Sequence, residues 1–188
     1  MYYFKHIFFL LFLTIPFSIT RAQIREFTHP EIISFEDSTD PVTAGKNSKV
    51  SLSNKHYKHL GHSLQWNWDK PNAQIFINQP IGYLSQNPNP KETSLSTFIF
   101  WIYNPKAISS GKLKFEFLKQ GKVCSWFEYG MNFTGWSGAW LIFNRDMQGT
   151  PEEGMDELRI TAPNTNYGEI FLDHIILSSF QDVRHQTA

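Results

Sequence analysis

The sequence lacks the features that mark several protein classes. Cys124 is the single cysteine among 188 residues, which excludes an internal disulfide and a cysteine-rich zinc site. Basic and acidic residues number 17 each, so a nucleic-acid-binding protein that depends on excess positive charge is not expected. With 11 glycines and 10 prolines, the chain is neither collagen-like nor of low complexity. Its length allows one globular domain, with or without a short leader.

The longest apolar run is too short to cross a membrane. It covers residues 7–17, whereas a transmembrane helix needs about 20 residues. Lys5 precedes the run, and the small residues around Thr20-Arg21-Ala22 follow it, an order that predicts a cleaved export signal over residues 1–22. An uncleaved membrane anchor is the alternative. We therefore expect residues 23–188 to be exported, periplasmic or secreted, free of the membrane and monomeric.

The rest of the chain has the pattern of short strands separated by turns. Apolar and polar residues alternate in 63–68, where Leu64, Trp66 and Trp68 share one face. Residues 98–103 are apolar on both faces, which predicts a central strand buried on two sides. Outside the export signal, no long window has helical periodicity. Further strands are expected at 32–36, 49–53, 74–78, 112–117, 123–129, 139–143, 157–160 and 169–180. This spacing predicts one all-β domain, a two-sheet antiparallel sandwich or a closed barrel.

No catalytic motif stands out in the sequence. Gly-x-Ser-x-Gly, His-Glu-x-x-His and a phosphate-binding glycine loop are all missing, and Cys124, which we expect to be buried, follows no nucleophile signature. His56, His59 and His62 are spaced three apart, but on a strand this spacing sends successive side chains to opposite faces. Zinc also needs four ligands in a tetrahedral array. We interpret the histidines as part of a solvated basic loop and expect the domain to be non-catalytic.

A stretch rich in glycine and aromatic residues covers residues 129–140. Tryptophan or tyrosine at the rim of a sandwich can stack on the apolar face of a sugar ring. The alternative is that these rings pack in a core that is aromatic throughout. The candidate carbohydrate-binding residues are Tyr129, Trp136, Trp140 and Arg145.

Two carboxylates near opposite ends of the chain form a candidate cation site. Glu36 and Asp173 lie in predicted terminal strands, which a jelly roll brings together, and Ser34 points to the same side as Glu36. Lys58 and Gly61 could add main-chain carbonyls, and a hard cation such as calcium takes about 6–8 oxygen ligands. We expect a structural calcium or sodium ion at these five residues. The alternative, a pair of surface carboxylates without an ion, stays open.

Several motifs in this order resemble a known family, the N-terminal domain of chondroitin sulfate ABC lyases, which degrade glycosaminoglycans. The resemblance runs from about Phe35 to the C-terminus. The motifs are His56-Tyr57-Lys58-x-x-Gly61-x-Ser63-Leu64-x-Trp66-x-Trp68, Pro80-Ile81-Gly82-Tyr83, Phe133-Thr134-Gly135-Trp136 with Ala139-Trp140, Arg145-Asp146-Met147-x-Gly149-Thr150-Pro151, Gly154-Met155-Asp156-x-Leu158-Arg159-Ile160, and Leu172-Asp173.

The resemblance implies a jelly-roll sandwich similar to carbohydrate-binding modules, often with a structural cation. It implies that the base and acid of β-elimination belong to an α-helical toroid and later β domains, outside residues 23–188. Ser137 stands where the resemblance implies an arginine, which weakens the case for an anionic-sugar contact there. The densest basic cluster for a polyanion is Lys55, His56, Lys58, His59 and His62.

Three functions therefore stay open. The first is a non-catalytic, carbohydrate-binding-like module whose partner is a glycosaminoglycan, chondroitin or dermatan sulfate, or the catalytic domain. The second is a fragment of an active lyase whose catalytic domains lie in separate or lost sequence. The third is a scaffold whose rim aromatics serve as an interdomain interface.

Overall fold

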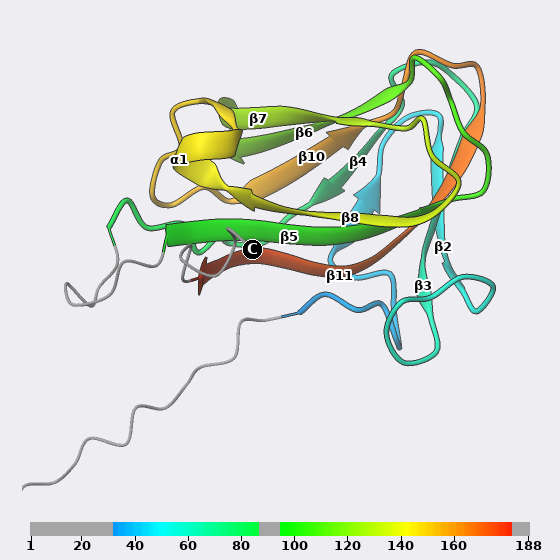
Figure 1. The fold of residues 1–188 in the computed structure, drawn as a ribbon, viewed down its shortest axis with the longest axis horizontal. Coiled ribbons are helices and arrows are strands. Elements are labelled where there is room, and N and C mark those ends of the chain that lie inside the picture. Colours follow the sequence, from blue (N-terminus) through cyan, green and yellow to red (C-terminus); the bar gives the residue numbers. More distant parts are fainter. Residues whose placement is uncertain (1–31, 87–94, 182–188) are drawn as a thin grey trace, which may run out of the picture.

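Two antiparallel sheets form the domain, and they pack face to face (Figure 1). The computed structural model describes residues 32–86 and 95–181. The predicted export signal over residues 1–22 lies outside the described residues. Within them, no helix is long and apolar enough to span a membrane. The predicted all-β antiparallel sandwich is confirmed.

The strands divide between a six-stranded and a five-stranded sheet. The six-stranded sheet has the order β1 (Val42–Ala44), β4 (Gln74–Ile77), β10 (Glu157–Thr161), β6 (Lys112–Lys119), β7 (Lys122–Gly130) and β9 (Gln148–Gly149). The five-stranded sheet has the order β2 (Ser48–Ser53), β3 (Ser63–Trp68), β11 (Gly168–Gln181), β5 (Leu95–Asn104) and β8 (Gly135–Ile142), and α1 (Phe143–Asp146) follows β8.

Phenylalanine rings fill the space between the sheets. Phe98 and Phe100 of β5 meet Phe115 of β6, and Phe115 stacks on Phe127 of β7 with ring centroids 4.6 Å apart. Such ring pairs add about 0.5–1.5 kcal/mol each beyond the burial of their apolar surface. Cys124 is buried and free, as expected. This core holds the two sheets at a fixed spacing and leaves two outer faces.

The predicted strand at residues 32–36 is wrong. Ile33 forms an isolated bridge with Ile175 on β11, and Phe35 has a left-handed backbone with φ of 59°. That conformation interrupts extended pairing. The sequence pattern was misleading because Ile33 and Phe35 are buried, as alternating strand residues would be, without belonging to a ladder. Three short elements were also missed: β1, α1 and β9.

The prediction for residues 98–103 is half right. In β5 the side chains of Phe98, Phe100 and Ile102 are fully buried between the sheets. The opposite side chains, Trp101 and Tyr103 among them, are half-buried on the outer face of the five-stranded sheet. The second apolar face of β5 is therefore a partly covered surface rather than core.

Candidate functional site

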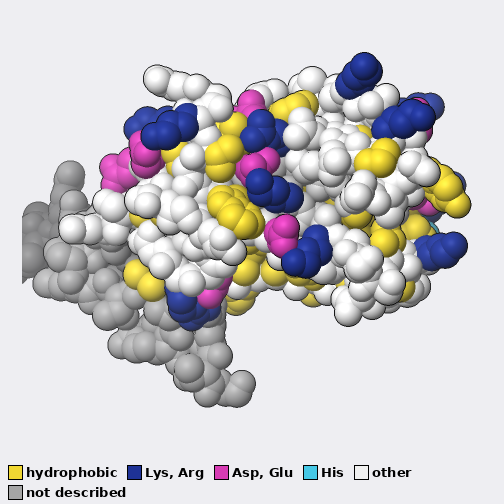
Figure 2. Space-filling view, turned by 90° about the horizontal axis from the view of Figure 1, so that it is seen from above, with side chains coloured by type: hydrophobic (Ala, Val, Ile, Leu, Met, Phe, Trp, Pro, Cys, Tyr) yellow, Lys and Arg dark blue, Asp and Glu magenta, His cyan; other side chains and the backbone are white. Residues whose placement is uncertain are grey.

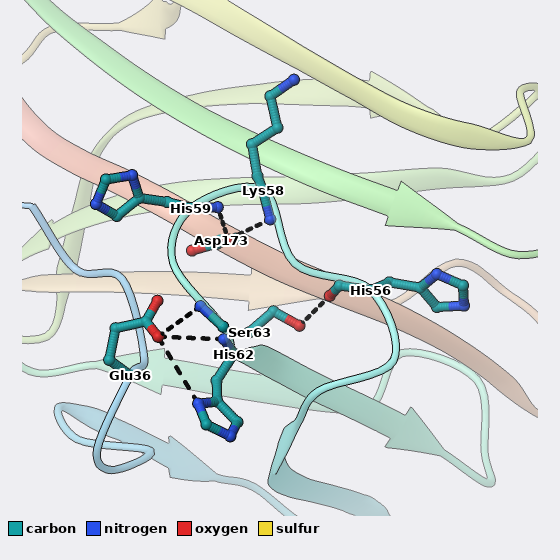
Figure 3. A network of polar contacts seen from close by, with 8 residues as sticks. Glu36, His56, Lys58, His59, His62, Ser63 and Asp173 are labelled. Atoms are coloured by element: carbon teal, nitrogen blue, oxygen red, sulfur yellow. Dashed lines mark hydrogen bonds and ion pairs between the residues drawn. The ribbon is translucent and has the colours of Figure 1, made fainter.

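The loop between β2 and β3 covers part of the outer face of the five-stranded sheet and contacts two carboxylates (Figure 3). Asp173 Oδ2 accepts hydrogen bonds from the amides of Lys58 at 2.6 Å and His59 at 2.9 Å. Glu36 Oε2 accepts from the amides of Gly61 at 2.9 Å and His62 at 3.2 Å. Successive amides that converge on one anion form a nest. Two such nests attach the loop to β11 and to the N-terminal segment.

Asp173 is fully buried at the centre of this arrangement. The ladder between β11 and β5 has an irregular register directly after Asp173, and His174 has a φ of 51°. A bulge of this kind redirects side chains. The amide of His174 donates to Asp173 Oδ1 at 2.7 Å. Burial raises the pKa of Asp173, the negative charge of Glu36 adds to this rise, and the three amides oppose it.

Glu36 has one carboxylate oxygen that its neighbours do not satisfy. Within the described residues, Glu36 Oε1 is buried and has no hydrogen-bond partner. A polar pocket of about 230 Å³ borders Glu36 and Ser34. A buried carboxylate oxygen without a donor is costly unless a cation or a proton compensates it. This oxygen is the structural feature that fits the predicted cation.

The other predicted ligands are placed less favourably. In the described ranges, no group of three or more His, Cys, Asp or Glu side chains is arranged to hold a metal ion. The carbonyl of Lys58 shares a trans peptide unit with the His59 amide, so it points away from Asp173 Oδ2. The same holds for the Gly61 carbonyl and Glu36 Oε2. Ser34 and the main-chain carbonyls of Lys58 and Gly61 therefore stay predicted ligands.

The three loop histidines point in different directions (Figure 3). The ring of His56 stacks on Tyr103, with centroids 3.7 Å apart. The ring of His59 lies 5.5 Å from that of His174, and His62 Nδ1 lies 3.7 Å from Glu36 Oε2. The histidines thus attach the loop at three separate places.

A row of aromatic side chains continues from this loop across β5 and β8. We call it the aromatic face: His56, Lys58, Trp101, Tyr103, Trp136 and Trp140. Tyr103 contacts Trp136 edge to face, with centroids 5.5 Å apart. Lys58 Nζ lies 4.0 Å from the centroid of the Trp101 ring. Trp140 lies on the same side of β8 as Trp136 and is 46% exposed.

Gly138 makes room for this arrangement. It is the partner of Trp101 in the ladder between β5 and β8. A Cβ atom at Gly138 would lie 2.8 Å from Cδ2 of the Trp101 indole. The absence of a side chain therefore lets the indole pack closely against β8 at Gly138, and Lys58 Nζ lies over the same indole.

The four predicted carbohydrate-binding residues do not form one cluster. Trp136 and Trp140 belong to the aromatic face. Tyr129 lies between the sheets, where its hydroxyl is 2.6 Å from Ser137 Oγ. Arg145 lies in α1, and its guanidinium bonds Asp146 at 2.7 and 2.9 Å. Sequence reasoning missed Trp101 and Tyr103, although an apolar second face on β5 was the available signal.

Comparison with known proteins assigns the fold and the motifs to a family. The family described as "Lyase, N terminal" matches residues 29–188. The chain belongs to this lyase N-terminal domain family. A chondroitin sulfate ABC exolyase of Bacteroides thetaiotaomicron is 43% identical over 162 residues, which cover 86% of this chain and 16% of that protein. A chondroitin sulfate ABC exolyase of Proteus vulgaris is 39% identical over 149 residues, 79% of this chain and 14% of that protein.

Solved structures place this lyase N-terminal domain among carbohydrate-binding-module folds. The CBM22-1 xylan-binding domain of Paenibacillus barcinonensis Xyn10C superposes with a TM-score of 0.53 at 14% identity, covering 80% of this chain and 95% of that domain. The family 11 carbohydrate-binding module of Clostridium thermocellum Lic26A-Cel5E also gives 0.53 at 13% identity, covering 78% and 92%. The predicted jelly roll is confirmed. The chain spans about a sixth of the length of its curated lyase relatives.

Proposed function

We propose that this domain is a non-catalytic module that binds a glycosaminoglycan chain, such as chondroitin or dermatan sulfate, along the aromatic face. The observation that carries the proposal is Lys58, whose ammonium group lies over Trp101. No ion pair of Lys58 occurs in the described part of the chain. A cation beside partly exposed rings can bind a sulfate or carboxylate, while the rings stack on sugar.

The composition of the aromatic face suits a polysaccharide better than a compact ligand. Its rings extend from His56 and Tyr103 across β5 to Trp140 on the edge strand β8. A linear polymer can contact such a row at several sugars, each contributing weakly. The whole sequence carries no net charge, so attraction to a polyanion has to be local. Lys55 and Lys58 supply that local charge, and His56, His59 and His62 lie in the same loop.

Calorimetric titration with chondroitin sulfate oligosaccharides tests this proposal. We expect binding in the millimolar to micromolar range. Trp140→Ala should weaken it about tenfold, the effect of losing about 1.4 kcal/mol at an exposed anchor. Trp126→Ala, on the opposite outer face, is the matched control and should leave the affinity unchanged. No heat at millimolar ligand would overturn the proposal.

An interdomain contact is the second candidate for the same surface. Tyr57 is 47% exposed and Leu60 69% exposed, and both belong to the loop beside the aromatic face. Large apolar side chains grouped on a surface commonly mark an interface. If the surface binds the catalytic part of a lyase, Leu60→Ser should weaken assembly of the two parts and leave oligosaccharide binding intact.

The proposed binding module and an active lyase differ in one measurable activity. We expect no β-elimination by this chain alone, measured as unsaturated product formed from chondroitin sulfate. Formation of that product by the purified chain would replace the proposed binding module with an enzyme.

We also propose a structural cation, calcium or sodium, beside Glu36 Oε1 and Asp173. The orphaned Glu36 oxygen supports it, and a bound ion would join the N-terminal segment to β11. An ion that binds the folded state raises the melting temperature with its concentration. We expect CaCl₂ or NaCl to raise the melting temperature of EDTA-treated protein, with no such rise in Glu36→Gln. An unchanged melting temperature would exclude the ion.

A further inference from the structure

A second hollow lies at one end of the sandwich and shares no residue with the aromatic face. Its volume is about 940 Å³, within the range of about 300–1,000 Å³ typical of small-ligand sites. Three connections surround it: the turn after β3, the loop from β5 to β6, and the loop from β10 to β11. We call it the end pocket, and its lining includes Trp68, Asn104, Lys106, Asn166, Tyr167 and Glu169.

The walls of the end pocket are fixed by internal contacts. Trp68 Nε1 donates to Thr165 Oγ1 at 3.1 Å, which ties the β10–β11 loop to β3. A Cβ at Gly168 would lie 2.0 Å from Cζ2 of Trp68, so only glycine allows this close packing. Buried Asn104 donates to the carbonyls of Met131 and Phe133 and accepts from the Lys106 amide. A pocket with fixed walls loses little entropy when a ligand binds.

The groups at the mouth of the end pocket are, by contrast, free to bind. Tyr167 is 79% exposed, the most exposed large apolar side chain in the described ranges. Asn164 and Asn166 are exposed, and no hydrogen bond of either side chain occurs within the described residues. An amide side chain both donates and accepts hydrogen bonds. The exposed ring of Tyr167, with the side-chain amides of Asn164 and Asn166 in the same loop, suits a ligand that has an apolar face and hydroxyl groups at its edge.

The charges of the end pocket indicate which sugar it would take. Lys106 and Glu169 are the charged side chains that line it, and they are opposite in sign. Glu169 Oε1 also accepts a hydrogen bond from Gln65 Nε2. The balanced charge contrasts with the unpaired Lys58 of the aromatic face, so a sulfate or carboxylate gains little here. We infer that the end pocket is a second carbohydrate site, which binds one uncharged pyranose ring stacked on Tyr167.

Titration of the ¹⁵N-labelled chain with galactose, N-acetylgalactosamine and glucuronate tests this inference. We expect the two neutral sugars to shift the amide signals of residues 105–109 and 164–168 with millimolar dissociation constants. Glucuronate should bind no more tightly than galactose. Tyr167→Ala should raise the dissociation constant at least tenfold, and Tyr167→Phe should restore it because the ring is retained.

Two further variants separate this site from the aromatic face. Asn166→Ala should weaken the neutral sugars severalfold, whereas Trp140→Ala should leave them unchanged. The converse holds for chondroitin sulfate oligosaccharides if the proposed function is right, so either site can fail alone. The inference is overturned if no saturable shift occurs at residues 105–109 and 164–168 with 100 mM sugar, or if Tyr167→Ala leaves the affinity unchanged.

Discussion

The two outer faces of the sandwich carry the same motif, a lysine over a tryptophan ring, in different electrostatic surroundings. On the six-stranded sheet, Lys114 Nζ lies 4.9 Å from the Trp126 centroid and 2.7 Å from Glu116 Oε1. On the five-stranded sheet, Lys58 Nζ lies 4.0 Å from the Trp101 centroid and has no carboxylate partner among the described residues. One cation is neutralised in place, and the other is available to a ligand.

The carboxylates of the two faces differ in the same way. Figure 2, viewed from the side of β6, β7 and β10, shows basic and acidic side chains next to one another. There Glu116 pairs with Lys114 and Arg159. On the five-stranded face, Glu36 and Asp173 instead accept hydrogen bonds from main-chain amides of the loop between β2 and β3. On the six-stranded face, the carboxylate of Glu116 neutralises neighbouring cations. On the five-stranded face, the carboxylates bind main-chain amides instead, and Lys58 has no carboxylate partner among the described residues.

The largest expected loss of stability comes from substitution of Asp173, the carboxylate that holds the loop between β2 and β3. Asp173→Ala removes the acceptor of three amides, those of Lys58, His59 and His174. Each buried donor left unpaired costs about 1–3 kcal/mol, reduced where water can enter, so we expect a loss of about 2–4 kcal/mol. Urea unfolding measures this loss of stability. The stability of Asp173→Asn should fall between those of the wild type and Asp173→Ala. A loss below about 0.5 kcal/mol would show that the loop does not depend on this carboxylate.

Glu116→Gln should cost less, about 1–2 kcal/mol at pH 7. Burial opposes ionisation of Glu116, but the hydrogen bonds and charges of Lys114 and Arg159 outweigh it and lower the pKa of this carboxyl. A lowered pKa stabilises the fold above the unfolded-state pKa, and this contribution is lost as the pH falls through the folded-state pKa. The wild type should therefore lose stability more steeply below about pH 4 than Glu116→Gln does. Parallel acid profiles in urea unfolding would contradict the ion-pair interpretation.

The sheets were predictable because their signals are local. Alternation in 63–68 and 112–117 is a property of neighbouring residues, and both became strands. Glu36 and Asp173 could also be paired from the sequence, since a jelly roll brings its terminal segments together. The contacts of the loop with them could not, because nests depend on backbone angles such as the φ of 51° at Leu60. No residue type specifies that angle outside glycine.

The aromatic face was half predictable for a different reason. Trp136 and Trp140 were predicted as rim aromatics from a glycine-rich context, but Trp101 lay within a strand whose two faces are both apolar. Periodicity gives the side of a strand and does not say whether a second sheet covers it. In this domain the second sheet covers one side of β5, and the other side stays half-exposed.

Substitution of Lys58 and of Lys114 tests directly whether the two outer faces differ in binding. Lys58→Ala should weaken binding of chondroitin sulfate oligosaccharides about tenfold, or about 1.4 kcal/mol, because an unpaired cation is lost. Lys114→Ala should leave binding unchanged, because Lys114 is already paired with Glu116. Titrations at two salt concentrations should show a weaker salt dependence for Lys58→Ala alone. Equal losses from both substitutions would show that the faces do not differ in function.

The smallest expected effect concerns Ser137, where the resemblance implies an arginine. Ser137 Oγ lies 2.6 Å from the Tyr129 hydroxyl, on the side of β8 that faces the other sheet. Side chains alternate along a strand, so an arginine here would start from the side opposite Trp136 and Trp140. We expect Ser137→Arg to change oligosaccharide affinity less than twofold. Ala139→Arg, on the same side of β8, is the matched control and should change the affinity equally little. A tenfold gain in Ser137→Arg alone would mean that β8 turns this position toward the ligand, and the aromatic face would then extend around the sheet edge.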